Sequence, residues 1–238
     1  MAEVPVPRGP RGHYRKSAER RRRIVTAAAQ VFSRDGYRGA TIRKIAAEAG
    51  MSPSSLLHFF GSKQELLWAT MAHRDAHRFT GGRAGERGFP DRVVGQAVAN
   101  EEIPHLLQLY AVLSAESATR DHPAQEYFAS RFATVRAGIA ADFEALAAVG
   151  LLRAGVDPES AAVTVVALWD GVQLQWLHDP EVISAAQILR DYFALVLTDP
   201  AVLTDIATLR QEWRACPPQA APEPEAYDGG VAPSVDPL

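Results

Sequence analysis

The sequence has little cysteine and no long uncharged run, and each shortage excludes a class of protein. Cys216 is the single cysteine among 238 residues, so it cannot form an intramolecular disulfide or a multi-cysteine zinc or iron–sulfur site. The longest stretch without Asp, Glu, Lys or Arg is the 14 residues 49–62, whereas a membrane-spanning helix needs about 20 mostly apolar residues. The composition therefore predicts a soluble, cytoplasmic protein with no membrane segment.

Motifs for common enzyme chemistry are also absent. The sequence contains no G-x-x-x-x-G-K-[ST] phosphate loop, no G-x-S-x-G nucleophile turn and no H-E-x-x-H zinc motif. His73 and His77 share a helix face at a spacing that could hold a metal, but no third ligand lies nearby in the sequence. We therefore expect neither an enzyme, nor a cofactor, nor a metal site.

The charge is divided unevenly along the chain. Residues 1–63 contain 13 Lys and Arg against 4 Asp and Glu, whereas residues 64–238 contain 12 against 24. A basic N-terminal quarter on an acidic remainder favours a nucleic-acid-binding module joined to a second unit. Residues 1–17 have little to bury and are predicted to be a disordered basic arm that could follow the DNA backbone or minor groove. The Pro-rich residues 215–238 are predicted to be a disordered tail.

Three short helices are predicted before the acidic part of the chain, over 24–35, 42–49 and 53–60. Apolar residues repeat at helical spacing in the first, which ends at Gly36. Thr41 and Ser52 stand at the N-cap positions of the second and third. Two short helices joined by a tight glycine-containing turn are typical of a helix-turn-helix motif. A fourth helix begins with the capping box at 62–65 and is expected to run towards Phe79.

The remainder of the chain shows apolar residues at helical spacing and no alternating pattern of useful length. The predicted helical ranges are 92–103, 104–117, 123–152, 158–177, 183–197 and 201–214. The expected fold is all-α, with a helix-turn-helix DNA-binding domain over 18–64 and a second helical domain over 65–214.

The N-terminal motifs resemble those of the TetR family of bacterial transcription regulators. The resemblance rests on Ile-Val-x-Ala-Ala-x-x-Val-Phe (24–32), Asp-Gly-Tyr-x-Gly-Ala-Thr-Ile-Arg-Lys-Ile-Ala (35–46), Ala-Gly-Met-Ser-Pro-Ser-Ser-Leu (49–56) and His-Phe-Phe-Gly-Ser-Lys-Gln-Glu-Leu-Leu (58–67). Residues 113–123 and 170–180 resemble the BetI-type C-terminal domain of the same family. The resemblance implies a homodimeric repressor that binds an inverted-repeat operator in double-stranded DNA and is released by a small-molecule effector. It also implies that the helical domain over 65–214 is the ligand-binding and dimerisation domain.

The residues expected to contact DNA lie on the two short helices and their flanks. The second helix of such a motif enters the major groove, so Ser54, Ser55 and His58 are candidates for base edges or phosphates. Arg43 is the better candidate for a contact with guanine or with a phosphate. The hydroxyl of Thr41 and the ammonium of Lys63 are predicted to bind phosphates, and Ser52 is a further candidate DNA contact. The family often has Tyr where this chain has Leu57, which cannot donate a hydrogen bond.

Two further sets of residues are predicted in the C-terminal helices. Large side chains in a small-residue background could line an effector pocket or simply form the core; they are Leu109, Tyr110, Leu113, Tyr127, Phe128, Phe132, Trp169 and Trp176, with His105, Gln173 and Glu116 as polar anchors. By resemblance, the last two strong helices form the dimer surface, with candidate contacts Leu168, Gly171, Val172, Gln175, Leu189, Tyr192 and Phe193. A DNA-binding protein without a small-molecule switch, controlled by a protein partner or acting structurally, remains the alternative.

Overall fold

A computed structural model describes residues 11–75 and 88–215, and the regular secondary structure in these two ranges is helical. A single bridge, Leu152 to Leu197, is the exception there. The all-α prediction is thus confirmed. Residues 1–10 of the predicted arm, residues 216–238 of the predicted tail, His77 and Cys216 lie outside the described residues. None of the described helices combines the length and apolar composition needed to cross a bilayer.

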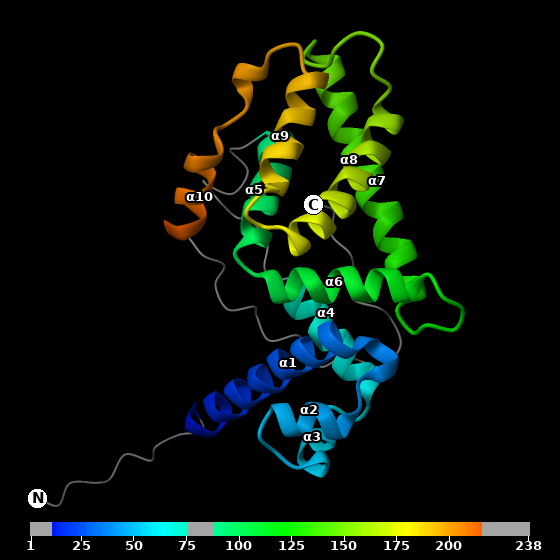
Figure 1. Ribbon diagram of the computed structural model, residues 1–238, viewed down its shortest axis with the longest axis vertical. Helices are drawn as coiled ribbons and strands as arrows, with labels where there is room; N and C mark the ends of the chain where they lie inside the picture. The colour runs from blue at the N-terminus through cyan, green and yellow to red at the C-terminus, as the bar shows by residue number, and fades with distance from the viewer. Residues whose placement is uncertain (1–10, 76–87, 216–238) are drawn as a thin grey trace, which may run out of the picture.

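The N-terminal part consists of α1 (Arg11–Gly39), α2 (Ile42–Glu48), α3 (Pro53–Phe59) and α4 (Lys63–Asp75), at the lower end of Figure 1. The predicted caps are present: the Thr41 hydroxyl accepts from Lys44 N at 3.2 Å, and the Ser52 hydroxyl accepts from Ser55 N at 3.2 Å. These two caps fix where α2 and α3 begin, and therefore which side chains they present outward.

Helix α1 begins earlier than the sequence patterns indicate. It starts at Arg11, inside the segment 1–17 that we expected to be a disordered arm. Residues 13–23 contain neither Pro nor Gly and are rich in Arg, Lys, Ala and Glu, all good helix formers. The basic segment therefore continues the amphipathic helix upstream. At the other end Gly36 interrupts the helix with a φ of +67°, a conformation that favours glycine.

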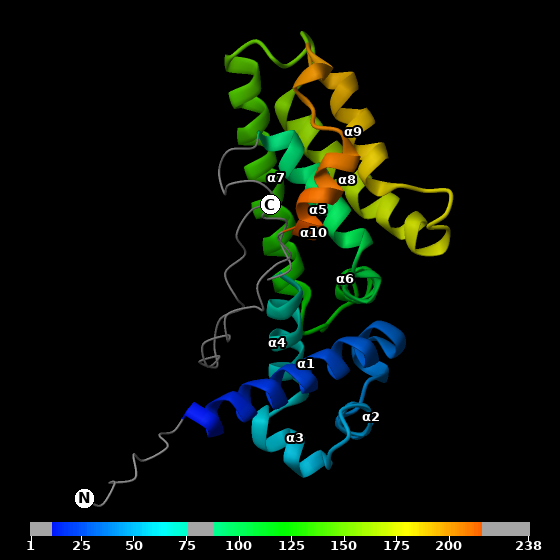
Figure 2. The same cartoon turned by 90° about the vertical axis from the view of Figure 1, so that its left-hand side faces the viewer.

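The C-terminal part consists of α5 (Phe89–Glu101), α6 (Pro104–Ser117), α7 (Gln125–Ala148), α8 (Pro158–His178), α9 (Ala185–Val196) and α10 (Ile206–Ala215). Helix α6 lies crosswise between the N-terminal helices and the upright α5, α7, α8 and α9 (Figures 1 and 2). The predicted helix over 201–214 is instead a short 3₁₀ turn, Pro200–Val202, followed by α10. A hydrogen bond of 2.9 Å from Thr204 N to Asp91 Oδ1 holds the intervening residues extended.

The hydrophobic core does not divide at the expected boundary between residues 64 and 65. One cluster joins α1, α2, α3 and α4 to the inner side of α6 and the start of α7, and a second joins α5, the rest of α7, α8, α9 and α10. In the first cluster Leu66 and Leu67 of α4, Phe32 of α1 and Leu109 of α6 are almost fully buried. The hydrophobic core of α1–α4 is thus completed by α6 of the C-terminal part.

Candidate DNA-binding surface and effector cavity

The outer side of α2 and α3 presents most of the side chains predicted to contact DNA. Thr41, Arg43, Ser52, Ser54, Ser55 and His58 are all exposed. On the opposite side Ile45 and Leu56 are fully buried, which fixes the orientation of the two helices. The exposed set therefore lies on one rigid unit at the lower end of the molecule (Figure 1).

Three serine hydroxyls cluster at the start of α3. Ser52 Oγ lies 2.8 Å from Ser55 Oγ and 3.1 Å from Ser54 Oγ. A hydroxyl can both donate and accept, so such a group can bind base edges or phosphate oxygens. Leu57, one turn further on, is 41% exposed and adds an apolar contact to the same helix. Leu57 was not among the predicted DNA contacts, because its side chain cannot donate a hydrogen bond.

Lys63 differs from the other predicted contacts, because its ammonium is engaged within the protein. Lys63 Nζ donates to the carbonyl oxygens of Tyr37 at 2.9 Å and Ala40 at 3.1 Å, and lies 4.2 Å from the centre of the Tyr37 ring. Burial lowers the pKa of this ammonium, and the nearby Glu116 carboxylate partly opposes that effect. Lys63 thus ties the start of α4 to the α1–α2 turn.

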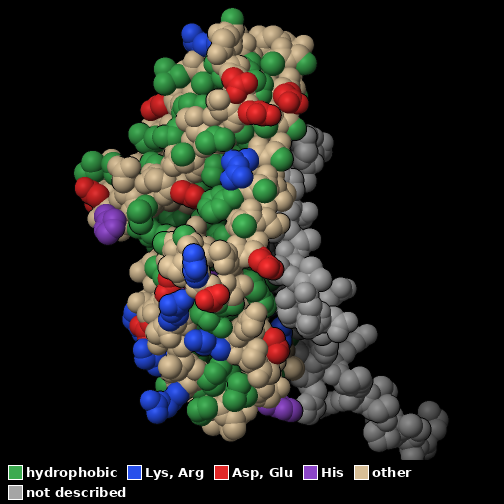
Figure 3. All heavy atoms as spheres, turned by 90° about the vertical axis from the view of Figure 1, so that its right-hand side faces the viewer, with side chains coloured by type: hydrophobic (Ala, Val, Ile, Leu, Met, Phe, Trp, Pro, Cys, Tyr) green, Lys and Arg blue, Asp and Glu red, His purple; other side chains and the backbone are tan. Residues whose placement is uncertain are grey.

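Arginines in the first half of α1 add positive charge beside α3. The guanidinium of Arg20 lies 5.9 Å from the ring centre of Phe59, and that of Arg21 lies 4.3 Å from the ring centre of Phe60. Arg22 and Arg23 are exposed. In Figure 3, Lys and Arg side chains are more frequent over the lower part of the molecule than over the upper part. The charge imbalance of the sequence is therefore also a spatial one.

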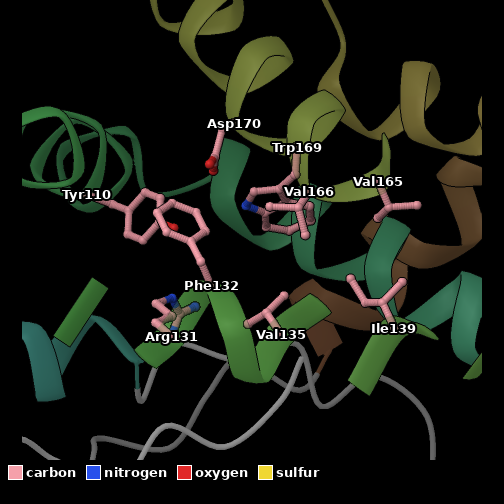
Figure 4. A pocket seen from close by; sticks show the side chains of 9 residues that line it. All are labelled: Tyr110, Arg131, Phe132, Val135, Ile139, Val165, Val166, Trp169 and Asp170. Atoms are coloured by element: carbon pink, nitrogen blue, oxygen red, sulfur yellow. The ribbon is translucent and has the colours of Figure 1, made fainter. Parts of the chain in front are cut away.

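A small cavity lies between α6, α7 and α8 (Figure 4). Its volume is ≈ 20 Å³, and its lining residues are Tyr110, Arg131, Phe132, Val135, Ile139, Val165, Val166, Trp169 and Asp170. Three of these, Tyr110, Phe132 and Trp169, were predicted from the sequence. The charged pair Arg131 and Asp170 was not, because hydrophobic periodicity selects apolar side chains.

The other residues predicted for the pocket lie elsewhere. Leu109, Leu113, Tyr127 and Phe128 are buried in the core that α6 and α7 share with the DNA-binding helices. Gln173 accepts a 3.2 Å hydrogen bond from Asn100 Nδ2, and Trp176 is buried without lining the cavity. His105 is exposed on α6. Spacing identifies a buried face, but it cannot show which buried residues border a void.

Asp170 is the least satisfied polar group of the cavity wall. Its Oδ1 atom is buried and has no hydrogen-bond partner among the described residues. Burial raises the pKa of this carboxyl to about 6, against the opposing effect of the Arg74 and Arg131 charges. Both guanidinium groups lie near the Tyr110 ring, at 4.3 Å for Arg74 and 5.6 Å for Arg131. The cavity thus combines aromatic faces with a buried carboxylate.

Glu116, predicted as a pocket anchor, instead joins α6 to the α1–α2 turn. Its Oε2 accepts a 2.6 Å hydrogen bond from Tyr37 N, and a Cβ at Gly36 would collide with the same carboxylate. The buried His122 places Nε2 3.7 Å from Glu116 Oε2, and its ring packs edge-on against Tyr37 at 5.3 Å. Burial lowers the pKa of His122. This contact connects the C-terminal helices directly to the helix-turn-helix.

The predicted dimer contacts divide into exposed and buried positions. Gly171 and Gln175 are exposed and Leu168 and Tyr192 are half-buried, whereas Val172, Leu189 and Phe193 are buried within the chain's own core. The exposed apolar residues of α8 and α9 are instead Val163, Leu174, Ile188 and Leu195. The predicted dimer contacts on α8 and α9 thus include inward-facing residues, because these form the strongest apolar pattern in the sequence, and the two helices stay a prediction as the dimer surface.

Known proteins share this architecture and its motifs. Residues 24–70 match the model of bacterial regulatory proteins of the tetR family, and residues 95–198 match that of the BetI-type transcriptional repressor C-terminal domain; together the matches span more than half of the chain. The transcriptional regulator BetI of Brucella anthropi is 43% identical over 54 residues, which are 23% of this chain and 28% of that relative. The chain thus matches little more than a quarter of the length of this curated relative.

Solved structures extend the similarity to most of the chain. A TetR-family transcriptional regulator from Rhodococcus sp. has a TM-score of 0.59 at 25% identity, covering 76% of this chain and 100% of that one. A transcriptional regulator from Saccharomonospora viridis, solved in complex with choline, has a TM-score of 0.62 at 21% identity, covering 76% and 100%. With both family models matched in chain order on the expected helices, this chain belongs to the TetR family of transcriptional regulators and carries a BetI-type C-terminal domain.

Proposed function

We propose that the chain is a homodimeric repressor, which binds an inverted-repeat operator through α2 and α3 and leaves it when a small-molecule effector binds the C-terminal helices. The observation that carries this proposal is the exposed polar surface of α2 and α3, held rigid by buried Ile45 and Leu56. In helix-turn-helix proteins the second helix enters the major groove while the first crosses the backbone.

Each exposed side chain has a role on this DNA surface. Arg43 has the donors for a bidentate contact with guanine, and Ser54, Ser55 and His58 can bind base edges. Leu57 can pack against a thymine methyl group, the kind of contact that apolar side chains make in the major groove. Thr41 and Ser52 lie at helix starts and would bind phosphates, with Lys63 supporting the turn behind them.

The dimer surface proposed here follows the exposed apolar residues of α8 and α9. On α8 these recur at helical spacing, at Val163, Ala167, Gly171 and Leu174, and on α9 they are Ile188 and Leu195. Leu195 is 72% exposed, which is unusual for a large apolar side chain unless a partner covers it. Packing α8 and α9 on a second copy about a two-fold axis makes a four-helix bundle. The two α3 helices would then meet half-sites about 34–36 Å apart.

Helix α6 supports the proposed link between effector and DNA. It borders the cavity through Tyr110 and contacts the α1–α2 turn through Glu116. An effector that widens the cavity would displace α6, and α6 would carry the DNA-binding helices with it. Such coupling needs two arrangements with different affinities for DNA. That the S. viridis regulator was solved with choline supports a small-molecule effector for a protein of this fold.

The small size of the cavity favours a second candidate function. A volume of ≈ 20 Å³ holds about one water molecule. A nearly closed core would suit a DNA-binding protein controlled by a protein partner, with no small-molecule effector. The two candidates share their DNA surface and differ in whether an added compound releases the protein from DNA.

Fluorescence anisotropy on DNA upstream of the chain's own gene tests both candidates. We expect saturable binding that survives excess competitor DNA, with two protomers per site and an affinity that falls as salt is raised. A compound screen on the same complex would then find release for the ligand-controlled repressor and none for the alternative. Absence of any binding at low salt would overturn both.

A further inference from the structure

The wall of the cavity has an unusual chemical composition for a site of its size. Three aromatic rings, four aliphatic side chains, the Arg131 guanidinium and the Asp170 carboxylate line it (Figure 4). The Oδ1 atom of Asp170 is buried and lacks a hydrogen-bond partner in the described parts of the chain. Buried carboxylate oxygens are normally paired, because leaving one unpaired costs free energy. An unpaired oxygen at a cavity therefore points to a missing donor.

A positively charged donor suits this position best. The carboxylate accepts hydrogen bonds and attracts a cation, while the rings of Phe132 and Trp169 attract cations through their π systems. The Tyr110 ring already lies against the Arg74 and Arg131 guanidinium groups. An ammonium group is about the size of a water molecule, and ≈ 20 Å³ is enough for one. The same space is too small for a bulky head group without movement of the walls.

The neighbouring arginines narrow the choice of cation. The guanidinium groups of Arg74 and Arg131 lie against the Tyr110 ring, and their charges act on Asp170. Neither gives Oδ1 a hydrogen bond. A further cation placed beside these two is repelled unless it donates a hydrogen bond directly to the carboxylate in return. A quaternary ammonium has no N–H to donate, so it bears the repulsion without this gain.

We infer that the cavity binds the protonated head of a small primary or secondary amine, which donates an N–H hydrogen bond to Asp170 Oδ1 and rests against Phe132 and Trp169. The inference rests on the proposed function in that this amine is the effector. Its alkyl part would press on the apolar wall formed by Val135, Ile139, Val165 and Val166, and so open α7 from α8.

Titration calorimetry on the full-length protein without DNA tests the ligand class directly. The probes are propylamine, its N,N,N-trimethyl derivative and butanoate, which compare one short alkyl chain with three head groups. We expect propylamine to bind roughly 10- to 100-fold more tightly than the trimethyl compound, the value of one charge-assisted hydrogen bond. Equal or tighter binding of the trimethyl compound, strongest binding of butanoate to the arginines, or no binding of propylamine would each overturn the inference.

A pair of variants locates the binding. Asp170→Asn keeps the shape of the side chain and removes its charge, so propylamine affinity should fall about 10- to 100-fold. Asp142→Asn is the matched control: it removes a charge from α7 that pairs with Arg92 on the surface, and affinity should not change. Wild-type affinity in Asp170→Asn would contradict the inference. The comparison of the three probes on the wild-type protein holds even if the variant is poorly folded.

Operator binding, followed by anisotropy in parallel, separates this inference from the proposed function. Operator binding without propylamine binding would overturn the amine inference and leave the DNA-binding function intact. Propylamine binding without operator binding would support the amine site and overturn the repressor. Release of the operator by propylamine but not by its trimethyl derivative would support both.

Discussion

Arg43 and Lys63 carry the same charge, but the fold uses them for different purposes. Arg43 is exposed in the first turn of α2, whereas Lys63 Nζ donates hydrogen bonds to the carbonyl oxygens of Tyr37 and Ala40. A motif match treats both as DNA contacts, because it records residue type and spacing only. Where the side chain ends decides whether its charge meets DNA or stabilises the domain.

Substitution at the two positions should therefore produce opposite results. Arg43→Ala should leave the free energy of unfolding within about 0.5 kcal/mol of wild type and weaken operator binding by about 1–3 kcal/mol. Lys63→Met should lower the free energy of unfolding by about 1–2 kcal/mol, because two carbonyl groups lose a donor. Urea titration and anisotropy measure the two quantities. If Lys63→Met kept its full stability but lost DNA binding, Lys63 would be a phosphate contact and not a structural residue.

Asp170 should make stability depend on pH in an unusual direction. Its pKa is raised from 3.8 to about 6, so the folded protein holds this proton more tightly than the unfolded chain does. Well below pH 3.8 the carboxyl is protonated in both the folded and the unfolded protein, so it does not lower the free energy of unfolding. From pH 4 to about 6 only the unfolded chain releases the proton, so this group's contribution to stability falls as pH rises.

Asp170→Asn should remove that dependence. At pH 7 we expect the variant to be more stable than wild type by up to about 3 kcal/mol, and the difference should vanish near pH 4. Urea unfolding of both proteins across this pH range measures the difference between their free energies of unfolding. The other titrating groups are the same in both proteins, so their contributions cancel. A stability difference that stays constant with pH would show that the carboxylate is solvated in the folded protein.

At the scale of elements, the contact between α6 and the α1–α2 turn depends on a glycine. Gly36 has a φ of +67°, and a Cβ there would meet the Glu116 carboxylate that accepts from Tyr37 N. The absence of a side chain thus allows α6 to approach the backbone of the DNA-binding part. The same contact stands beside His122 and Lys63, so one small junction joins α1, α4 and α6.

A double-mutant cycle with Gly36→Ala tests this dependence. Alone, Gly36→Ala should lower the free energy of unfolding by about 1–2 kcal/mol because of the left-handed backbone, and further because the Tyr37 N–Glu116 hydrogen bond is lost. In a Glu116→Ala background only the first cost remains, so the two effects should be non-additive by at least about 0.5 kcal/mol. Hydrogen exchange at the Tyr37 amide is a direct check: protection should fall in Glu116→Ala and persist in Glu116→Gln, which still has an acceptor. Additive energies would mean that the contact is not coupled.

The elements themselves were largely predictable, and their mutual contacts were not. Thr41, Ser52 and Pro104 mark helix starts because capping and proline chemistry act within a few residues. Whether Leu109 borders a cavity or the core under α1 depends on residues some 80 positions away, which spacing cannot report. Asp170 and Glu116 were missed or misplaced for the same reason: a lone charge in a helix has no periodic signature.

At the scale of the whole molecule, the exposed side of α8 and α9 predicts how the protein assembles. Gly171 is exposed, and a Cβ built there meets no atom within 4 Å. Gly171→Arg should therefore leave the protomer folded, with unchanged helical circular dichroism, and convert a dimer to a monomer in sedimentation velocity. Ala145→Arg, at an exposed position on α7, is the matched control and should remain dimeric. A Gly171→Arg protein that stays dimeric would place the interface elsewhere.

The core that α6 shares with α1 and α4 also limits how this regulator can be recombined with its relatives. A cut at residue 64 would separate Phe32, in the N-terminal piece, from Leu66 and Leu109, in the C-terminal piece, although all three pack in one core. A chimaera that exchanges DNA specificity between relatives should therefore carry α6 and the start of α7 along with α1–α4. The unit that can be exchanged between relatives is therefore set by the extent of this core, and it is larger than the helix-turn-helix motif.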